Sequence, residues 1–230
     1  GNGTPNFSNA TEEYDGSSWT SGGNLGTGRR DLAGRGTQTA GIVFGGDEPP
    51  ASNKTEEYDG SSWTAGGNLS AVRLVHGGTG TQTAALAFAG SNAFPTADNN
   101  VTSSEEYNGS SWTAGGNMNT ARYFISGGGS QTSTLAFGGT GPAVPGPTTK
   151  TESYDGTSWT EVNDLAIARY GAGGAGSDNT SALCFFGDGS IDNATEEWSF
   201  PPATASTLQE GDMWFNSSSS TLKGYGTAAG

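Results

Sequence analysis

Pairs of adjacent glutamates are the residues of this sequence best suited to acid–base or calcium chemistry. They are Glu12-Glu13, Glu56-Glu57, Glu105-Glu106 and Glu196-Glu197, each followed by an aromatic residue. Carboxylates bind Ca²⁺, and two converging acids can cleave a glycosidic bond. Each pair, however, lies in a stretch that reads as a β-strand, where neighbouring side chains point to opposite faces. Two adjacent carboxylates therefore cannot chelate one ion together, and we interpret them as scaffold residues.

An arginine recurs ten residues after a tryptophan in four places: Arg29, Arg73, Arg122 and Arg169. A ring of guanidinium groups at the mouth of a channel would suit a carboxylate or a sulfate. The favoured interpretation is structural: each arginine fixes the loop between blades. An alternative role for one glutamate of each unit is a charge-assisted bond to the arginine of a neighbouring blade.

A single histidine, His76, and a single cysteine, Cys184, limit the remaining chemistry. One cysteine excludes an intrachain disulfide, and the apolar run around it favours a small buried side chain. No nucleophile elbow and no phosphate-binding loop with a lysine is present. We therefore predict no catalytic, cofactor-binding or metal-ligating residue and no cofactor, and the sequence leaves the binding residues unknown.

The charge balance excludes some classes of partner. The 230 residues carry a formal net charge of −14 with only 9 Lys and Arg. Phosphate neutralisation needs basic patches, so we predict no nucleic-acid partner. No apolar run approaches the length of a membrane span and no signal peptide is recognisable, so no membrane insertion is expected. The sequence opens on Gly1, which we interpret as a processed or excised segment.

These residues belong to a sequence unit that is repeated about five times. The stretch 11–20 returns almost unchanged at 55–64 and 104–113 and more loosely at 151–160, and a fifth copy starts at 195. Successive copies lie 44, 49, 47 and 44 residues apart, measured on the Tyr or Trp of each. Self-similarity at such a period is the signature of a repeat architecture.

Each unit predicts four β-strands. Dipeptides such as Asp15-Gly16 favour tight hairpin turns, which makes the Glu-Glu-Tyr and Ser-Trp-Thr segments consecutive strands. An apolar run ending in glycine supplies another strand, and the stretch after the arginine, around Tyr123 to Ile125, supplies the innermost. Four strands in 44 to 49 residues, without a sustained helical period, predict an all-β propeller with no significant helix.

The order of residues within the unit resembles the Kelch motif, in which a diglycine ends the second strand, a Tyr lies on the third and a Trp opens the fourth. Two units match fully, with Gly45-Gly46, Tyr58 and Trp63, and with Gly138-Gly139, Tyr154 and Trp159. Two others depart from the diglycine, at Ala89-Gly90 and Gly187-Asp188. The resemblance covers roughly residues 1–200 and implies a propeller of four-stranded Kelch-like blades.

The units are nearly identical in sequence, and in this they also resemble Kelch-like arrays in bacteriophage virion and tail proteins. Residues 211–216 and 221–225 are similar to a short module of phage fibre proteins, and they predict a hairpin that turns at Ser217 to Ser220. We therefore expect a propeller over 1–200 and a hairpin or linker module over 201–230.

The repeat is out of phase at the two ends of the sequence. Three whole units, half a unit at the front and most of one at the back predict about five blades. The stretches 12–14 and 196–198 both match the third strand of the unit, so they cannot both belong to one blade. Three alternatives stay open: the N-terminal strands complete a five-bladed ring, the array is part of a larger ring, or another subunit completes the sheet.

These observations predict a non-enzymatic structural or binding module, displayed outside the cell or on a virion surface. We expect a protein or glycan partner, together with self-assembly or contacts to virion components. Specificity is expected in the variable loops Asp47 to Lys54, Ser91 to Ser103 and Thr140 to Lys150. Aromatic residues outside the repeat, available for stacking, are Phe94, Trp214 and Tyr225. The alternative is a carbohydrate-active enzyme with two carboxylates about 5 to 10 Å apart at the channel mouth.

Overall fold

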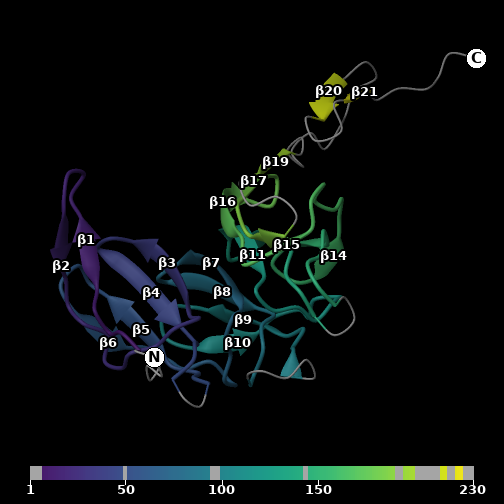
Figure 1. Cartoon of the computed structure of the whole chain (residues 1–230). Helices are drawn as coiled ribbons and strands as arrows, with labels where there is room; N and C mark the ends of the chain where they lie inside the picture. Colours follow the sequence, from purple (N-terminus) through teal and green to yellow (C-terminus); the bar gives the residue numbers. More distant parts are fainter. Residues whose placement is uncertain are drawn as a thin grey trace, which may run out of the picture.

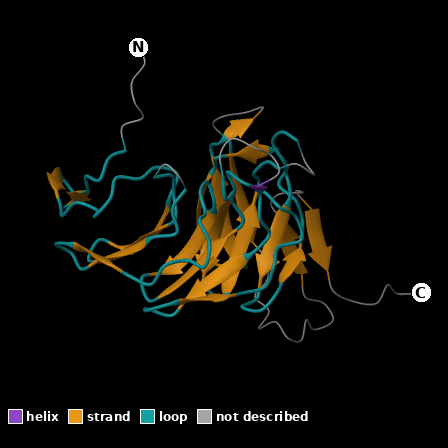
Figure 2. Ribbon diagram, turned by 90° about the horizontal axis from the view of Figure 1, so that it is seen from below, coloured by secondary structure: helices purple, strands orange, loops and turns teal. Residues whose placement is uncertain are grey.

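The computed structural model describes residues 7–48, 51–93, 99–141, 145–189, 194–199, 213–216 and 221–224. These residues form strands and loops, with a 3₁₀ conformation at Asn99, and no α-helix occurs among them (Figure 2). The antiparallel sheets are arranged as the blades of a β-propeller, which confirms the fold class expected from the repeat.

Three blades are complete four-stranded sheets in which consecutive strands pair. The first contains β3 (Ala33–Thr37), β4 (Ala40–Phe44), β5 (Thr55–Tyr58) and β6 (Trp63–Ala65). The second contains β7 (Gly77–Thr81), β8 (Ala84–Phe88), β9 (Ser104–Tyr107) and β10 (Trp112–Ala114). The third contains β11 (Ser126–Ser130), β12 (Ser133–Phe137), β13 (Thr151–Tyr154) and β14 (Trp159–Glu161).

The fourth blade has three strands in the described residues, and half a blade precedes the first. Blade four is formed by β16 (Gly173–Asp178), β17 (Ser181–Phe185) and β19 (Thr195–Ser199), with β19 at the outer edge. The half-blade is the hairpin of β1 (Glu12–Tyr14) and β2 (Trp19–Ser21). Four blades and this half replace the expected number of about five.

Two short pairs complete the strand inventory. β15 (Arg169–Tyr170) pairs with β18 (Asp188–Gly189) next to blade four. β20 (Met213–Asn216) pairs antiparallel with β21 (Thr221–Gly224), as the sequence predicts for a hairpin in the last thirty residues. The turn predicted at Ser217 to Ser220 and the rest of the module lie outside the described residues.

The hairpin between the two outer strands is built from the Asp-Gly or Asn-Gly dipeptide. The carboxylate of Asp59 accepts hydrogen bonds from the backbone N–H groups of Ser61 and Ser62, and Gly60 takes a positive φ of 92°. These bonds, that from Ser62 foremost, lower the pKa of Asp59 to about 2. The repeated dipeptide therefore fixes the register in which Tyr58 faces Trp63.

The innermost strand starts later than the sequence suggests. We expected it around Tyr123 to Ile125, but β11 begins at Ser126. Phe124 takes a positive φ of 51°, which breaks an extended strand, and the equivalent Asp31 and Val75 do the same. Their backbones form a ladder across the blades: Val75 N–H donates to Asp31, Phe124 N–H to Val75, and Gly171 N–H to Phe124.

Successive blades pack through their innermost strands, with β3 against β7, β7 against β11 and β11 against β16. The half-blade and blade four lie at opposite ends of the array (Figure 1). Tyr14 and Trp19 of the half-blade are 48% and 66% exposed, whereas Tyr58, at the position equivalent to Tyr14 in blade one, is 3% exposed. The core is therefore a series of thin layers between blades, and the half-blade has one uncovered face.

Candidate functional site

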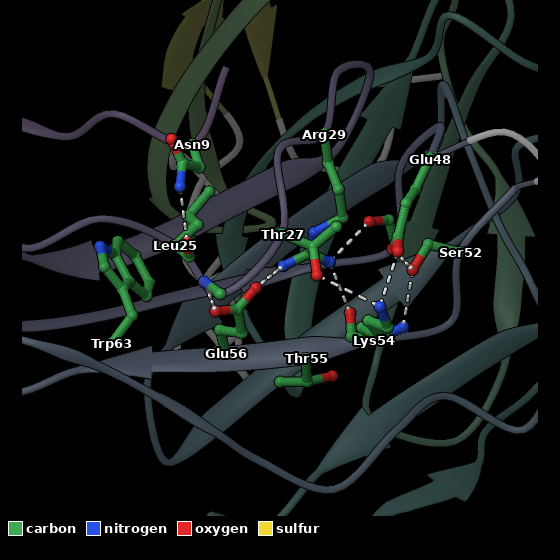
Figure 3. A network of polar contacts seen from close by, with 12 residues as sticks. Asn9, Leu25, Thr27, Arg29, Glu48, Ser52, Lys54, Thr55, Glu56 and Trp63 are labelled. Carbon is green, nitrogen blue, oxygen red and sulfur yellow. Dashed lines mark hydrogen bonds and ion pairs between the residues drawn. The ribbon is translucent and has the colours of Figure 1, made fainter. Parts of the chain in front are cut away.

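The repeated arginines and glutamates meet inside the scaffold. Arg29 donates from Nη2 to Oε1 of Glu56 at 2.6 Å and from Nη1 to the carbonyls of Gly45 and Lys54, both at 2.9 Å (Figure 3). The second carboxylate oxygen of Glu56 accepts the backbone N–H of Gly26 at 2.6 Å. The ion pair therefore fixes the linker that enters blade one to the third strand of that blade.

The same ion pair recurs in every blade. The Nη2–Oε1 distances are 3.2 Å for Arg73–Glu105, 2.8 Å for Arg122–Glu152 and 2.7 Å for Arg169–Glu196. In each blade a backbone N–H three residues before the arginine also donates to the glutamate. The structural interpretation of the arginines is confirmed, but each pairs within its own blade and not with a neighbouring one. The arginine lies in the linker just before the first strand of a blade, and it bonds to the third strand of that same blade.

In the first three pairs, the second glutamate points to the opposite face of the sheet and binds the next blade. Tyr107 Oη donates to Glu57 at 2.5 Å, and Tyr154 Oη donates to Glu106 at 2.7 Å. Tyr58 donates to Glu13 in the same way. The two carboxylates of a pair thus serve different partners, as the strand geometry predicts, and no group of metal-ligating side chains occurs among the described residues.

Tyrosine ionisation is expected to report these inter-blade bonds. Burial, and then the facing carboxylate, raises the pKa of Tyr107 and of Tyr154 to about 12. The folded state holds these protons more tightly than the unfolded chain, whose tyrosines ionise near pH ~10. The stability that they contribute is complete below about pH 10 and is lost as the pH rises towards 12.

The measurement is phenolate absorbance against pH, on the folded protein and on the chain in urea. The double variant Tyr107→Phe/Tyr154→Phe should lose two late-ionising groups and show a shallower loss of stability above pH ~10. Ionisation of both groups at the same pH in folded and urea-unfolded protein would contradict the inter-blade bonds.

His76 and Cys184 are buried and serve the scaffold. Burial raises the pKa of the Cys184 thiol to about 11, as expected for an inert apolar side chain. Neither ring nitrogen of His76 has a hydrogen-bond partner. Burial first, then Arg73 and Arg35, holds the pKa of His76 well below its ordinary value, so the imidazole is neutral.

Replacement of His76 by isoleucine is expected to stabilise the protein. The equivalent residue in the next blade is Ile125, which packs in a buried apolar cluster, and the change removes unsatisfied buried polar atoms worth about 1–3 kcal/mol. The unfolded chain binds a proton at His76 below pH ~6.5 while the folded state does not, so wild-type stability falls below that pH. The gain in His76→Ile should therefore be larger at pH 5 than at pH 7.5 in urea denaturation. An equal gain at both pH values would contradict a buried neutral histidine.

An aromatic patch appears where the repeat changes its residues. Tyr123, Phe124 and Tyr170 follow Arg122 and Arg169, at positions that Arg30-Asp31 and Leu74-Val75 occupy in earlier units. Ring centroids of Tyr123 and Phe124 lie 5.3 Å apart, and those of Phe124 and Tyr170 lie 5.8 Å apart. All three side chains are half-buried.

The patch adjoins one of the variable loops. Tyr123 exchanges backbone hydrogen bonds with Thr140, the first residue of the loop to Lys150. Tyr170 Oη donates to Asp188 at 2.5 Å. The repeat pattern predicts a strand at Tyr123 and Phe124 and therefore does not reveal the patch. The signal in the sequence is a pair of aromatic residues directly after a repeated arginine. Phe94 and the side chains of Trp214 and Tyr225 lie outside the described residues, as do the middle residues of the three loops.

A cavity of about 320 Å³ lies between blades three and four. Its apolar lining includes Phe137, Leu165 and Trp198, and Thr151 contributes a hydroxyl. The acidic residues around it are Asp164, Glu196 and Glu197. Because Glu196 is bonded to Arg169, its carboxylate belongs to the scaffold.

Comparison with known proteins adds no family. No protein-family model matches the chain, and no curated protein matches it significantly. None of the described residues forms a helix long and apolar enough to cross a membrane.

Proposed function

We propose that the protein is a non-enzymatic structural or binding module whose variable loops, with the adjoining aromatic patch, contact a protein or a glycan. The observation that carries the proposal is that the repeated polar side chains bond to one another within the scaffold, whereas unrepeated side chains lie beside a variable loop. The repeated arginines and first glutamates pair within blades, while Tyr58, Tyr107 and Tyr154 bond to the glutamates of the blade before them. Unrepeated side chains gather beside the loop that starts at Thr140.

The patch suits a flat apolar or sugar surface. Tyrosine offers a rigid ring with a polar tip, and such rings are enriched at binding surfaces. Loops held on a rigid scaffold are the usual carriers of recognition. A β-propeller supplies that scaffold here, and Asp188 beside Tyr170 adds an acceptor for hydroxyl groups.

Location on a virion, a fibre or another extracellular surface is part of the same proposal. It rests on the resemblance of the units to Kelch-like arrays of phage virion and tail proteins and on the C-terminal hairpin. In blade three, Gly138-Gly139 follow the second strand, Tyr154 ends the third and Trp159 opens the fourth, an order that supports the resemblance to the Kelch motif. A net charge of −14 favours partners other than nucleic acid.

The test is a glycan array together with a pull-down from virion or cell-surface components. The protein is expected to bind in one of them, and Tyr123→Ala/Tyr170→Ala is expected to weaken binding at least tenfold. Tyr14→Ala, which removes an exposed aromatic ring of the half-blade, at the opposite end of the array from blade four (Figure 1), is the matched control and should bind as the unchanged protein does. Blank results in both assays, or equal losses in the two variants, would overturn the proposal.

A further inference from the structure

The cavity between blades three and four corresponds to a position that a tryptophan fills in the complete blades. In blade two, Trp112 lies 4.9 Å from Phe44 of blade one, and its Nε1 donates to Thr55 Oγ1 at 2.9 Å. In blade three, Trp159 lies 5.2 Å from Phe88, and its Nε1 donates to Ser104 Oγ at 3.4 Å. In blades two and three, the fourth strand thus inserts its Trp against a Phe and a hydroxyl of the preceding blade.

Blade three presents the same two groups to blade four. Phe137 is equivalent to Phe44 and Phe88, and Thr151 is equivalent to Thr55 and Ser104. Both line the cavity, together with Leu165. Leu165 stands where Met118 packs in the cluster that contains Phe88 and Trp159. The walls of the indole site are therefore present, and the described residues supply no fourth-strand tryptophan to it.

The described residues also supply no fourth strand to the sheet of blade four, the strand that would carry this tryptophan. In blade three, β13 pairs with β14, and Tyr154 faces Trp159. In blade four, β19 is the edge strand, and Trp198 stands in the place of Tyr154. An exposed strand edge is a template for an added strand. A strand added there with the register of β14 places its Trp next to Trp198 and over the cavity.

Sequence changes around Trp198 indicate that β19 is the native third strand of blade four. Tyr58, Tyr107 and Tyr154 each bond to a glutamate of the preceding blade. Blade three has Ser153 at that glutamate position, and the Trp198 indole N–H donates to the Asn179 carbonyl while the Asn179 amide donates to Ser153. The loss of the tyrosine hydroxyl and the loss of its acceptor therefore go together. A strand that binds here adds to β19 and does not replace it.

A second copy of this chain does not fit the site. Its exposed Trp19 lies on β2, but the edge of β2 that would face β19 is already paired with β1. β1 in turn is held to blade one, because Trp63 Nε1 donates to Thr11 at 2.9 Å and Tyr58 donates to Glu13.

The geometry points to a protein-binding site that is distinct from the loops: β19 accepts an extended partner strand, and the cavity between blades three and four takes the tryptophan of that strand. This is strand addition to a sheet edge with one anchoring side chain. At about 320 Å³ the cavity falls at the small end of ligand pockets, which span roughly 300–1,000 Å³. The site does not depend on the ligand proposed for the loops.

The test uses a labelled peptide with the sequence of residues 109–117, Gly-Ser-Ser-Trp-Thr-Ala-Gly-Gly-Asn, and measures its anisotropy with the full chain. We expect saturable binding, with at least a tenfold weaker affinity when the peptide's Trp is replaced by Ala. Ala182→Phe, which narrows the cavity, should weaken binding at least tenfold. Thr151→Val, which removes the hydroxyl acceptor, should weaken it several-fold. The matched control is Thr55→Val, the same change at a filled position, and it should leave binding unchanged.

Three results would overturn the proposal. They are no binding at millimolar protein, equal binding of the Trp and Ala peptides, or equal effects of Thr151→Val and Thr55→Val. Circular dichroism of each variant verifies folding, and Tyr123→Ala/Tyr170→Ala should bind the peptide normally. The peptide assay therefore fails or succeeds independently of the loop assays.

Discussion

Arg122→Met is expected to lower the free energy of unfolding by about 3–5 kcal/mol, because it leaves a buried carboxylate without its counter-charge. The side chains of Arg122 and Glu152 are both 0% exposed, and they meet at 2.8 Å. The substitution also removes the donors of the Gly138 and Lys150 carbonyls, each held at 2.7 Å. The expected measurement is a lower urea midpoint, with loss of amide protection in blade three.

The control for this variant lies close to Glu152 in the sequence. Lys150 and Glu161 form an ion pair at 3.0 Å, but their side chains are 35% and 50% exposed. Exposed pairs contribute only about 0–1 kcal/mol, so Lys150→Met should barely shift the midpoint. A double variant, Arg122→Met/Glu152→Met, should recover part of the loss, because the stranded charge is gone. If Arg122→Met costs no more than Lys150→Met, the buried pair does not hold the blade together.

The sequence was sufficient for the architecture because the units repeat the same strand and turn signals. The Asp-Gly turns, the alternation of Glu-Glu-Tyr and the position of each Trp all predict one hairpin, and β5–β6 and β13–β14 form as expected. The strand after each arginine was misplaced because a left-handed residue has no strong sequence signal when it is Val75 or Phe124. The ladder of backbone bonds between blades selects that conformation, and it exists only in the assembled array.

The candidate sites were harder to predict for a related reason. Glu56 and Glu57 look alike in the sequence, but one binds an arginine of its own blade and the other a tyrosine of the next. The alternation of side chains along a strand predicts that the two glutamates lie on opposite faces, but it does not predict which residues they bind. The cavity between blades three and four lies where the other blades have a tryptophan side chain. It is recognised only when Phe137 and Thr151 are compared with the equivalent residues that surround a tryptophan in the structure.

Replacing a glycine of an innermost strand by alanine should change stability by very different amounts, depending on which atoms the added Cβ would meet. Gly174 and Gly34 hold the same position in their units, and neither has a positive φ that would itself penalise alanine. A Cβ on Gly174 would lie 2.5 Å from the carbonyl oxygen of Gly127 and 2.9 Å from its carbon, which is backbone of the neighbouring blade. A Cβ on Gly34 would meet Val43 Cγ1 at 3.5 Å, an ordinary contact.

Gly174→Ala is therefore expected to destabilise the protein by about 1–3 kcal/mol, since rigid backbone must move, and to expose the amides of β16 to hydrogen exchange. Gly34→Ala should be neutral or should stabilise by about 0.4–1 kcal/mol, through the lower entropy of the unfolded chain. The difference arises because β16 packs against β11 while no described innermost strand precedes β3. Equal effects of the two substitutions would mean that the blades do not pack backbone to backbone. The expected asymmetry would show that glycine is needed in these strands for blade contact and not for chain flexibility.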